Sequence, residues 1–268
     1  NQTETGLICD DLARHGYTLV RWDQPADLLV INGCTVTAES AAKTRKVAHS
    51  ARRRCPDAFI AVVGCAPEMD PAAWAADASV DLVLGNVVKE RLSDWLPAGL
   101  QRPACPTVQV GQGPCRGQPV TTFTEPGVGR VHERTRAHLK VQEGCDFFCS
   151  YCIVPHVRGP ARSRRWEDAL REASELVRRG HRELVLTGVN IATYADGGRD
   201  LADLVAAILD LGAGFRLRLG STEPGPVVHR LVRLMASEPR VCRFLHVPLQ
   251  YGEDSMLAAM NRRYRVAE

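Results

Sequence analysis

Short apolar runs and helix-like segments alternate along most of this chain, and no other feature limits its possible folds as strongly. In the first third, three runs rich in Val, Leu or Ile read ADLLVING, AFIAVVG and VDLVLGN. Helix-like segments separate them, and the longest starts after Thr37, a predicted N-cap. Continuous apolar strands joined by helices are typical of a parallel sheet covered on both faces. We therefore expect residues 1–98 to form an α/β domain, with a further short strand at residues 17–20.

The composition changes between residues 97 and 129. This stretch is dense in Pro, Gly and Gln and has no sustained periodicity, which is typical of a linker or a long irregular crossover. We place a linker at residues 99–129. Cys105 and Cys115 fall inside it, and because nothing else at metal-ligand spacing surrounds them, we interpret both as incidental thiols.

Strand-like and helix-like segments alternate again after the linker. The expected strands cover residues 137–144, 183–190, 215–224 and 243–250. Asp200 is a predicted N-cap of one helix, and Gly180 closes another. Strand–helix units with right-handed crossovers form the wall of a barrel, with functional residues at the carboxyl ends of the strands. The predicted fold class is thus α/β: a flavodoxin-like parallel-sheet domain, then a partial, truncated βα barrel over residues 130–268.

Three cysteines share one short loop in the stretch EGCDFFCSYCIVPHVRG. Cys145, Cys149 and Cys152 have the spacing C-x3-C-x2-C, and the loop begins where the first barrel strand is predicted to end. Structural zinc takes a closed set of four ligands, and the one nearby candidate, His156, follows a proline. A [4Fe–4S] cluster held by three thiolates leaves one iron open to a substrate. The loop therefore favours an open cluster, with a closed zinc or electron-transfer site as the alternative.

The wider stretch RAHLKVQEGCDFFCSYCIVPHVRGPARSR resembles the radical S-adenosylmethionine (SAM) enzymes, and in particular their methylthiotransferase branch. In that branch the loop commonly reads Gly-Cys, then Phe-Cys, then a Phe/Tyr-Cys-Ile-Val/Ile-Pro run that ends in Arg-Gly. The segments ELVLTGVN, STEP, LHVPLQYG and MNRRY agree in the same order, so the resemblance covers nearly the whole chain. It implies a radical SAM barrel in which Cys145, Cys149 and Cys152 hold the SAM-cleaving cluster.

The resemblance also implies a second, auxiliary [4Fe–4S] cluster on the N-terminal domain. Cys34 in INGCTVT and Cys65 in VVGCAP each follow an apolar strand, where two loops at one sheet edge can converge on a ligand. Taken alone, each would be interpreted as a small buried hydrophobic residue. The family's first cysteine would lie immediately upstream of this chain, and Cys9 is a poor substitute because it lies on the following helix. The chain departs from the family pattern at Gly33, where Thr is more usual, and at Tyr251, where Ser is usual.

The family attaches methylthio groups to adenosine 37 of tRNA or to an aspartate of a ribosomal protein. The NQ-x-E-T start and the loop LKVQEGCDFFCSYCIVPHVRG most resemble the branch that acts on C2 of N6-threonylcarbamoyladenosine in tRNA. Isopentenyladenosine in tRNA and the ribosomal protein are the alternatives within the family. A non-catalytic iron–sulfur protein is the alternative from another class. The resemblance implies two [4Fe–4S] clusters, SAM and a reducing electron donor, with the protein positioning cofactors that carry the chemistry.

Polar residues at the ends of the predicted strands would face the SAM pocket of such a barrel. The candidates are Thr187, Gly188, Asn190, Ser221, Thr222, Glu223, Pro248 and Gln250. Glu223 either contacts SAM or substrate, or serves as a carboxylate at a helix N-terminus. Phe147 and Tyr151 either pack against adenine or pack locally. The best candidates for contacts with RNA phosphates are Arg158, Arg162, Arg164 and Arg165.

Composition adds expectations about location and partners. The formal net charge of +3 is too mild to indicate a nucleic-acid partner by itself, although basic residues cluster at 51–55 and 158–165. Ten cysteines without a secretory signal favour metal or redox chemistry over disulfides. No apolar run approaches the ~20 residues that cross a bilayer. We expect a cytoplasmic monomer without a membrane partner and, because the sequence opens without Met, a piece of a longer protein.

Overall fold

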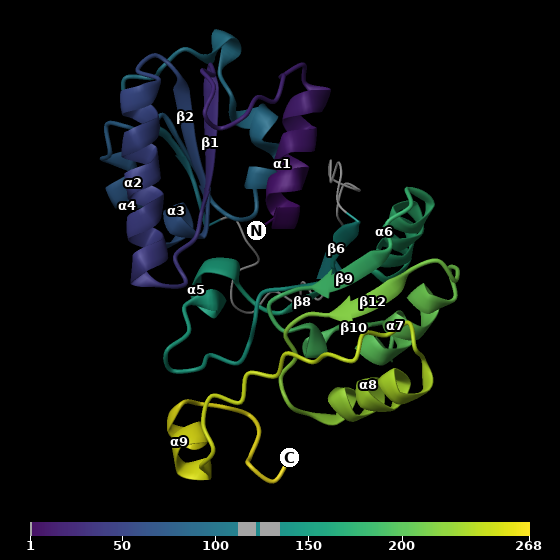
Figure 1. Ribbon diagram of the computed structural model, residues 1–268. Coiled ribbons are helices and arrows are strands. Elements are labelled where there is room, and N and C mark those ends of the chain that lie inside the picture. The colour runs from purple at the N-terminus through teal and green to yellow at the C-terminus, as the bar shows by residue number, and fades with distance from the viewer. Residues whose placement is uncertain (1, 112–121, 124–134) are drawn as a thin grey trace. The chain divides into compact units, whose positions relative to one another are not determined.

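A computed structural model describes residues 2–111, 122–123 and 135–268 (Figure 1). The chain forms two compact units. Unit 1 comprises Asn1–Cys115 and His156–Arg158, and unit 2 comprises Arg116–Pro155 and Gly159–Glu268. None of the described helices is both long enough and apolar enough to cross a membrane.

Unit 1 is built on a four-stranded parallel sheet in the order β1-β2-β3-β4. Its strands are β1 (Leu28–Gly33), β2 (Phe59–Gly64), β3 (Leu82–Leu84) and β4 (Thr107–Gln109). All six residues of β2 are buried, as a central strand covered on both faces requires. The registers pair Gly33 with Gly64, so β1 and β2 end at the same edge of the sheet.

Helices cover both faces of this sheet, because neighbouring residues of a strand point to opposite sides. Figure 1 shows α1 (Gln2–Arg14) and α2 (Ala38–Arg54) on opposite sides of β1 and β2. Ile60 and Val62 pack with α2, α3 (Cys65–Met69) and α4 (Pro71–Ala75). Phe59, Ala61 and Val63 pack with α1 and with the 3-10 helix η1 (Lys89–Trp95), which η2 (Ala98–Leu100) follows. Thr37 caps α2, as predicted, by accepting a hydrogen bond from Ser40 N at 3.1 Å.

Unit 2 carries a three-stranded parallel sheet in the order β12-β9-β6. Its strands are β6 (Arg136–Lys140), β9 (Glu183–Thr187) and β12 (Arg216–Leu219). Figure 1 shows α6 (Trp166–Arg178), α7 (Leu201–Leu209) and α8 (Pro226–Ser237) along one face of these strands. Leu139, Leu186 and Leu217 pack into this core. The other face carries charged side chains, among them Arg136, Glu183 and Arg218.

Smaller elements complete unit 2. A second sheet, in the order β5-β8-β7, consists of β5 (Thr122–Phe123), β8 (Arg162–Arg164) and β7 (Gln142–Glu143). The remaining elements are α5 (Val154–Arg158), η3 (Ile191–Thr193), β10 (Ala195–Asp196), β11 (Arg199–Asp200) and α9 (Asp254–Ala259). Asp200 caps α7 by accepting hydrogen bonds from two backbone N–H groups, and Gly180 follows α6 with a φ of +84°, both as predicted.

The predicted fold class is confirmed: the described chain is α/β, with parallel strands joined by helices in both units. Two predicted strands are wrong. Residues 17–20 pair with no strand among the described residues, and Leu19 and Val20 are exposed. Residues 243–250 form no ladder: His246 makes one isolated bridge with Ser221, and Val241, before this stretch, makes another with Leu217.

The predicted linker at 99–129 lies largely outside the described residues, as does Cys115. Its described part contains β4, which pairs in parallel with β3 and was not predicted from the sequence. Cys105 precedes this strand and is exposed. The boundaries proposed for the two domains and the linker stay predictions.

Candidate functional site

The cysteine loop follows β7, and its two ends are pinched together. Cys145 N donates a hydrogen bond to Gly159 O at 3.1 Å, and Ala161 N donates to Asp146 Oδ1 at 3.2 Å. Gly144 has a φ of +69°, and a Cβ there would collide with Pro160 O and lie 2.7 Å from Gly159 O. Only glycine tolerates both the left-handed backbone and this close approach. The pinch therefore closes residues 144–160 into one loop at the carboxyl end of the β6–β7 segment.

The three cysteines of the loop differ in exposure but influence one another. Cys149 is buried, whereas Cys145 and Cys152 are half-buried. Burial raises the pKa of the Cys145 thiol, and negative charge on Cys149 or Cys152 raises it further. Among the described residues, no group of three or more His, Cys, Asp or Glu side chains is already arranged to hold a metal ion. The structure therefore brings three soft donors onto one loop without fixing a ligand geometry.

Residues 260–264, which we call the clasp, form hydrogen bonds with this loop. Asn261 Nδ2 donates to Phe147 O at 3.0 Å and to Phe148 O at 2.9 Å. Ser150 N in turn donates to the backbone oxygen of the first clasp residue at 3.1 Å. Phe148 has a φ of +49°, a conformation that a bulky residue rarely adopts, so the clasp holds the loop in a strained shape.

Arg262 of the clasp enters the cysteine loop. Its Nη1 lies 3.2 Å from Cys149 Sγ and 3.2 Å from Tyr151 Oη. Its Nη2 pairs with Glu223 and donates to Pro248 O at 3.1 Å. Only 4% of the Arg262 side chain is exposed. Burial lowers the pKa of Arg262, but the bonds to Cys149 and Glu223 outweigh it, so the pKa is raised and the guanidinium stays charged.

Gln142 connects the start of the cysteine loop to the end of β9. Its Oε1 accepts hydrogen bonds from Val189 N at 2.9 Å and Asn190 N at 2.8 Å, while its Nε2 donates to Gly144 O at 2.8 Å. The side chain is 1% exposed and fully satisfied within the protein. Sequence reasoning gave Gln142 no role, although a lone amide between a buried strand and a glycine was a usable signal.

The predicted SAM-pocket residues at 187–190 and 221–223 lie at the carboxyl ends of β9 and β12, whereas Pro248 and Gln250 lie in a stretch that forms no strand. The structure joins some of them. Asn190 Oδ1 accepts a hydrogen bond from Glu223 N at 3.3 Å, which links the loops after β9 and β12. Asn190 Nδ2 is buried and has no hydrogen-bond partner among the described residues. Burial raises the pKa of Glu223, although Arg262 opposes this shift. Glu223 is therefore held in the site by Arg262 rather than at a helix terminus.

The other predicted pocket residues are less closely joined. Thr187 Oγ1 donates to Leu139 O at 3.4 Å, and a Cβ on Gly188 would lie 2.8 Å from Gln142 O. Ser221 Oγ lies 2.8 Å from His246 Nδ1 and thus has a different partner from Asn190 and Glu223. The side chain of Gln250 is exposed, and its φ of +62° marks a sharp turn. Their roles as cofactor contacts stay predictions.

In unit 1, Cys34 and Cys65 lie at the same sheet edge. Each directly follows one of the paired residues Gly33 and Gly64. Cys65 is buried and its Sγ lies 3.5 Å from Nδ2 of Asn86, which follows β3. A Cβ on Gly33 would lie 2.8 Å from the Ala66 Cβ and 2.8 Å from Thr44 Cγ2, so a larger residue there would force these neighbours to shift. Cluster binding by Cys34 and Cys65 stays a prediction.

Two of the four arginines expected to meet RNA are engaged inside the protein, so this expectation is wrong for them. Arg164 is fully buried, and its guanidinium pairs with Asp168 at 2.7 Å and with Glu172. Arg158 pairs with Glu4 at 2.7 Å within unit 1. Arg162 is half-buried and Arg165 is exposed. Clusters of arginine in a sequence do not reveal which of them have acidic partners.

The two aromatic residues of the cysteine loop have local partners. The Arg263 guanidinium lies 4.4 Å from the ring centroid of Phe147. The Tyr151 side chain is exposed apart from its hydroxyl contact with Arg262. Local packing is thus established for Phe147, which leaves the exposed Tyr151 ring as the one free to meet a ligand.

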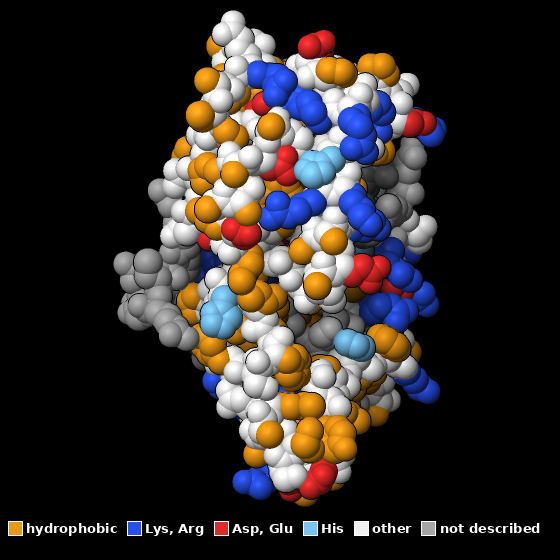
Figure 2. Space-filling view, turned by 90° about the vertical axis from the view of Figure 1, so that its left-hand side faces the viewer, with side chains coloured by type: hydrophobic (Ala, Val, Ile, Leu, Met, Phe, Trp, Pro, Cys, Tyr) orange, Lys and Arg blue, Asp and Glu red, His pale blue; other side chains and the backbone are white. Residues whose placement is uncertain are grey.

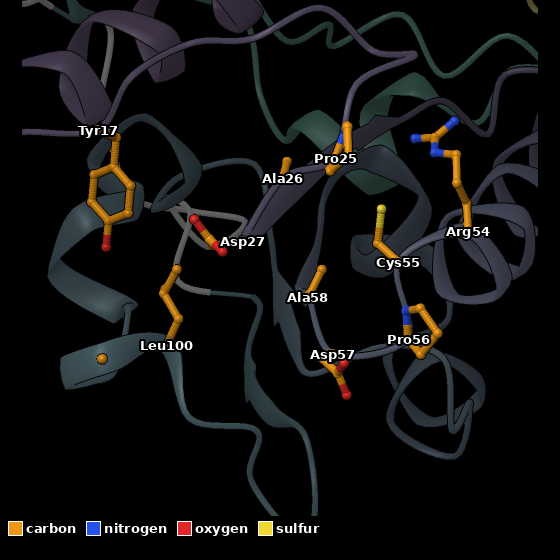
Figure 3. A pocket seen from close by; sticks show the side chains of 11 residues that line it. Tyr17, Pro25, Ala26, Asp27, Arg54, Cys55, Pro56, Asp57, Ala58 and Leu100 are labelled. Atoms are coloured by element: carbon orange, nitrogen blue, oxygen red, sulfur yellow. The ribbon is translucent and has the colours of Figure 1, made fainter.

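A cavity of about 720 Å³ lies elsewhere in unit 1 (Figure 3). Asp27 and Ala58 line it, and they immediately precede β1 and β2. Figure 3 shows Tyr17 and Leu100 on one side of it and Arg54 on the other. The cavity is therefore at the amino ends of the strands, whereas parallel α/β sheets bind ligands beyond their carboxyl ends. Its position separates it from Cys34 and Cys65.

Lys and Arg side chains gather on the outer face of α2, which Figure 2 shows among the basic side chains in its upper part. The exposed members are Lys43, Lys46, Arg53 and Arg54. Arg54 also stacks on the Trp22 ring, with 4.7 Å between the guanidinium carbon and the ring centroid. In the basic cluster at residues 51–55, Arg53 and Arg54 are therefore exposed, whereas Arg52 is half-buried and pairs with Asp81.

Two family models match this chain. The radical SAM superfamily model matches residues 139–268, which include the cysteine loop and the clasp. The model of the uncharacterized protein family UPF0004 matches residues 1–85, which include Cys34 and Cys65.

Curated relatives match over nearly the whole chain. A threonylcarbamoyladenosine tRNA methylthiotransferase, MtaB, of Bacillus subtilis (strain 168) is 33% identical over 267 residues, 98% of this chain and 58% of its own length. A tRNA-2-methylthio-N(6)-dimethylallyladenosine synthase of Rhodopirellula baltica is 30% identical and is covered over 59% of its length. The chain thus spans less than two thirds of these relatives.

A solved structure shares the fold at low sequence identity. The radical SAM methyltransferase TsrM from Kitasatospora setae, with tryptophan and a SAM analogue bound, matches with a TM-score of 0.62 and 14% identity. The match covers 99% of this chain and 60% of that one. At this identity the likeness concerns the fold alone.

Proposed function

The chain belongs to the radical SAM methylthiotransferase family, and from this premise we propose that it is a transferase that adds a methylthio group to C2 of N6-threonylcarbamoyladenosine at position 37 of tRNA. One observation carries the proposal: three thiols at C-x3-C-x2-C spacing sit on a closed loop at the carboxyl end of a parallel strand. That is where βα barrels place their chemistry. Relatives named for this reaction, at 33% to 34% identity, support the choice of base.

The donor chemistry of the site fits an iron–sulfur cluster and SAM. Cys145, Cys149 and Cys152 offer three soft ligands, one fewer than a closed site needs. Beside them lie a buried amide donor without a partner among the described residues, Asn190 Nδ2, and the largely buried carboxylate of Glu223. Buried polar groups need partners, and the amino and carboxylate groups of SAM have the matching chemistry.

When bound, the cluster supplies one electron for the reductive cleavage of SAM. The thiolates of the cysteine loop would bind its iron, and Gly144 lets the two ends of the loop approach each other. Gln142 fixes the loop after β9 relative to the loop start, and thereby orients Asn190. Glu223, held by Arg262, is in place to accept hydrogen bonds from SAM or substrate. These residues would position the reactants.

The auxiliary [4Fe–4S] cluster belongs to the same proposal. Cys34 and Cys65 supply two ligands from adjacent loops of one sheet edge, with Asn86 as a polar neighbour of Cys65. We assign to this cluster the sulfur that the reaction transfers, and to a second SAM the methyl group. A reducing partner supplies the electrons.

The substrate assignment rests on two further observations. The exposed basic face of α2 and the exposed Arg165 can contact a polyanion, and tRNA is one. A tRNA-modifying enzyme with this chain would act in the cytoplasm. Isopentenyladenosine in tRNA is the second candidate, because relatives named for that base match at 30% to 33% identity.

The test is product analysis of modified tRNA. The reconstituted full chain is incubated anaerobically with SAM, sulfide, a chemical reductant and tRNA that carries either threonylcarbamoyladenosine or isopentenyladenosine. Nucleosides from the digested tRNA are then separated and weighed by mass spectrometry, with a ribosomal-protein peptide as a third substrate. We expect the methylthio derivative of threonylcarbamoyladenosine. Modification of only the isopentenyl base or only the peptide would reassign the substrate to that molecule. No product from protein with intact clusters would contradict the proposed function.

A further inference from the structure

The guanidinium of Arg262 is the one cation among the described contacts of the cysteine loop that bonds to a cysteine sulfur. Its Nη1 lies 3.2 Å from Cys149 Sγ, and the side chain is 4% exposed. The next residue, Arg263, also touches the loop, but through the Asp146 carbonyl and the Phe147 ring. Two adjacent arginines of one clasp thus have different partners, and only one of them has a sulfur.

The described partners of Arg262 surround one site. They are the Cys149 sulfur and Tyr151 hydroxyl on the loop, the Glu223 carboxylate after β12, the Pro248 carbonyl and the Tyr264 ring. Glu223 is the single charged partner among them, and it bonds to Nη2 rather than Nη1. The nitrogen that faces Cys149 therefore shares its other proton only with a neutral hydroxyl. The guanidinium charge is delocalised, so Glu223 offsets part of it, but the N–H groups of Nη1 have no carboxylate among their described partners.

Hydrogen bonds to cluster sulfurs and nearby charge help to set the reduction potential of an iron–sulfur cluster. A reduced cluster carries one more negative charge than its oxidised form. A buried cationic donor at a ligand sulfur stabilises the more negative form, because little water is present to screen it. Such a donor therefore makes the cluster easier to reduce.

We propose that Arg262 is a positioning residue that makes the cluster on the cysteine loop easier to reduce, by donating an N–H···S hydrogen bond to Cys149. The inference rests on the proposed function, since it requires that the loop hold a cluster. Its second bond, to Glu223, connects the same guanidinium to the residue assigned to SAM. The planar guanidinium of Arg262 thus connects the proposed cluster ligand Cys149 with the proposed SAM-binding residue Glu223.

The test is an electron paramagnetic resonance titration of the reconstituted full chain against solution potential. All proteins carry Cys34→Ala and Cys65→Ala, so that the signal reports one cluster. Arg262→Gln removes the charge and the planar guanidinium. Arg262→Lys keeps a charged donor but loses the planar group that bonds to Cys149 and Glu223 at once, and Arg263→Gln is the matched control. For Arg262→Gln we expect about a ten-fold lower ratio of reduced to oxidised cluster at a fixed potential, a shift of about 59 mV for one electron. Arg262→Lys should lie between, and Arg263→Gln should titrate as the parent does.

Iron content and the potential separate the possible outcomes. If the parent holds no cluster, the proposed function itself fails. If Arg262→Gln binds a full set of iron and titrates at the parent's potential, the inference fails and the proposed function stands. Should Arg262→Gln not take up iron, Arg262→Lys decides: an unchanged potential in that variant overturns the inference. An equal shift in Arg263→Gln would also overturn it, because general damage to the clasp would then explain both.

Discussion

Glu183 shows how one residue can organise the polar face of a parallel sheet. It starts β9, and the registers place Arg136 of β6 and Arg216 of β12 directly beside it. Both Nε atoms lie 2.6 Å from its carboxylate, and Arg218 Nε lies at 2.9 Å. Three cations around one side chain that is only 4% exposed offset the cost of burying its charge.

We predict that Glu183→Gln destabilises the protein in a pH-dependent way. Burial raises the pKa of Glu183, but the bonds from Arg218 and Arg216 outweigh it, so the folded-state pKa lies below the ordinary value of 4.5. The ionised carboxylate therefore stabilises the folded state above that value, and this contribution is lost as pH falls through the lower folded pKa. Urea unfolding at pH 7 should show a loss of ~1–3 kcal/mol. The loss should shrink at about pH 3.

The matched control for this experiment is Glu167→Gln. The side chain of Glu167 is 78% exposed, and its Oε1 lies 3.7 Å from Nη2 of Arg199. Its loss should change the free energy of unfolding by less than ~0.5 kcal/mol. A Glu183→Gln effect of equal size at both pH values would show that packing, and not charge, holds this face together.

Individual residues also show where sequence reasoning stops. The cysteine triplet could be named as a candidate site from the sequence because its spacing restricts the ligands that it can hold. Arg262 was visible only as part of the motif MNRRY, and its role depends on contacts with residues 39 and 113 positions away. Arg164 and Arg158 were misjudged for the same reason, since their acidic partners are set by the fold. Long-range partners of charged side chains are not encoded in local spacing.

At the scale of elements, the closed cysteine loop depends on its glycine. Gly144 and Gly198 have similar φ values, +69° and +79°, but a Cβ on Gly198 would meet no atom within 4 Å. A Cβ on Gly144 would meet the backbone of Gly159 and Pro160. Substituting each glycine with alanine therefore distinguishes two destabilising effects: the strain of a left-handed alanine, present at both positions, and the displacement of the loop ends, expected only at Gly144.

We predict that Gly198→Ala costs ~1–2 kcal/mol of stability, as left-handed alanine does, and leaves iron binding intact. Gly144→Ala should cost more and should lower the iron content per chain after reconstitution, because the loop ends must move apart. Colorimetric iron analysis and urea unfolding measure the two effects. Equal iron content in both variants would show that the pinch is not needed for cluster binding.

Helices and central strands were predicted well because their signals are local. The N-caps at Thr37 and Asp200 and the apolar run that forms β2 can be recognised directly in the sequence. The errors concern strands, which exist only if a partner is present. Residues 17–20 have β-forming side chains but no neighbouring strand among the described residues, while β4 was hidden in a Pro-rich stretch and found its partner in β3.

At the scale of the whole molecule, both units use the same rule to place their candidate sites. Neighbouring parallel strands end at one edge, so loops that are distant in sequence converge there. This brings Cys34 beside Cys65 in unit 1, and joins the loops after β9 and β12 in unit 2. The locations of the sites followed from the alternation of strands and helices. The contacts that complete them, such as the clasp, required the structure.

The most direct test of the central claim is the formation of 5′-deoxyadenosine, measured by mass spectrometry under anaerobic, reducing conditions with SAM. The full chain is compared with Cys149→Ala, which loses a ligand of the proposed cluster, and with Cys105→Ala, which loses an exposed thiol outside both candidate sites. We predict product from the parent and from Cys105→Ala at similar rates, and none from Cys149→Ala. No product from a parent with a full complement of iron, or equal product from Cys149→Ala, would contradict the assignment of the cysteine loop as a SAM-cleaving site.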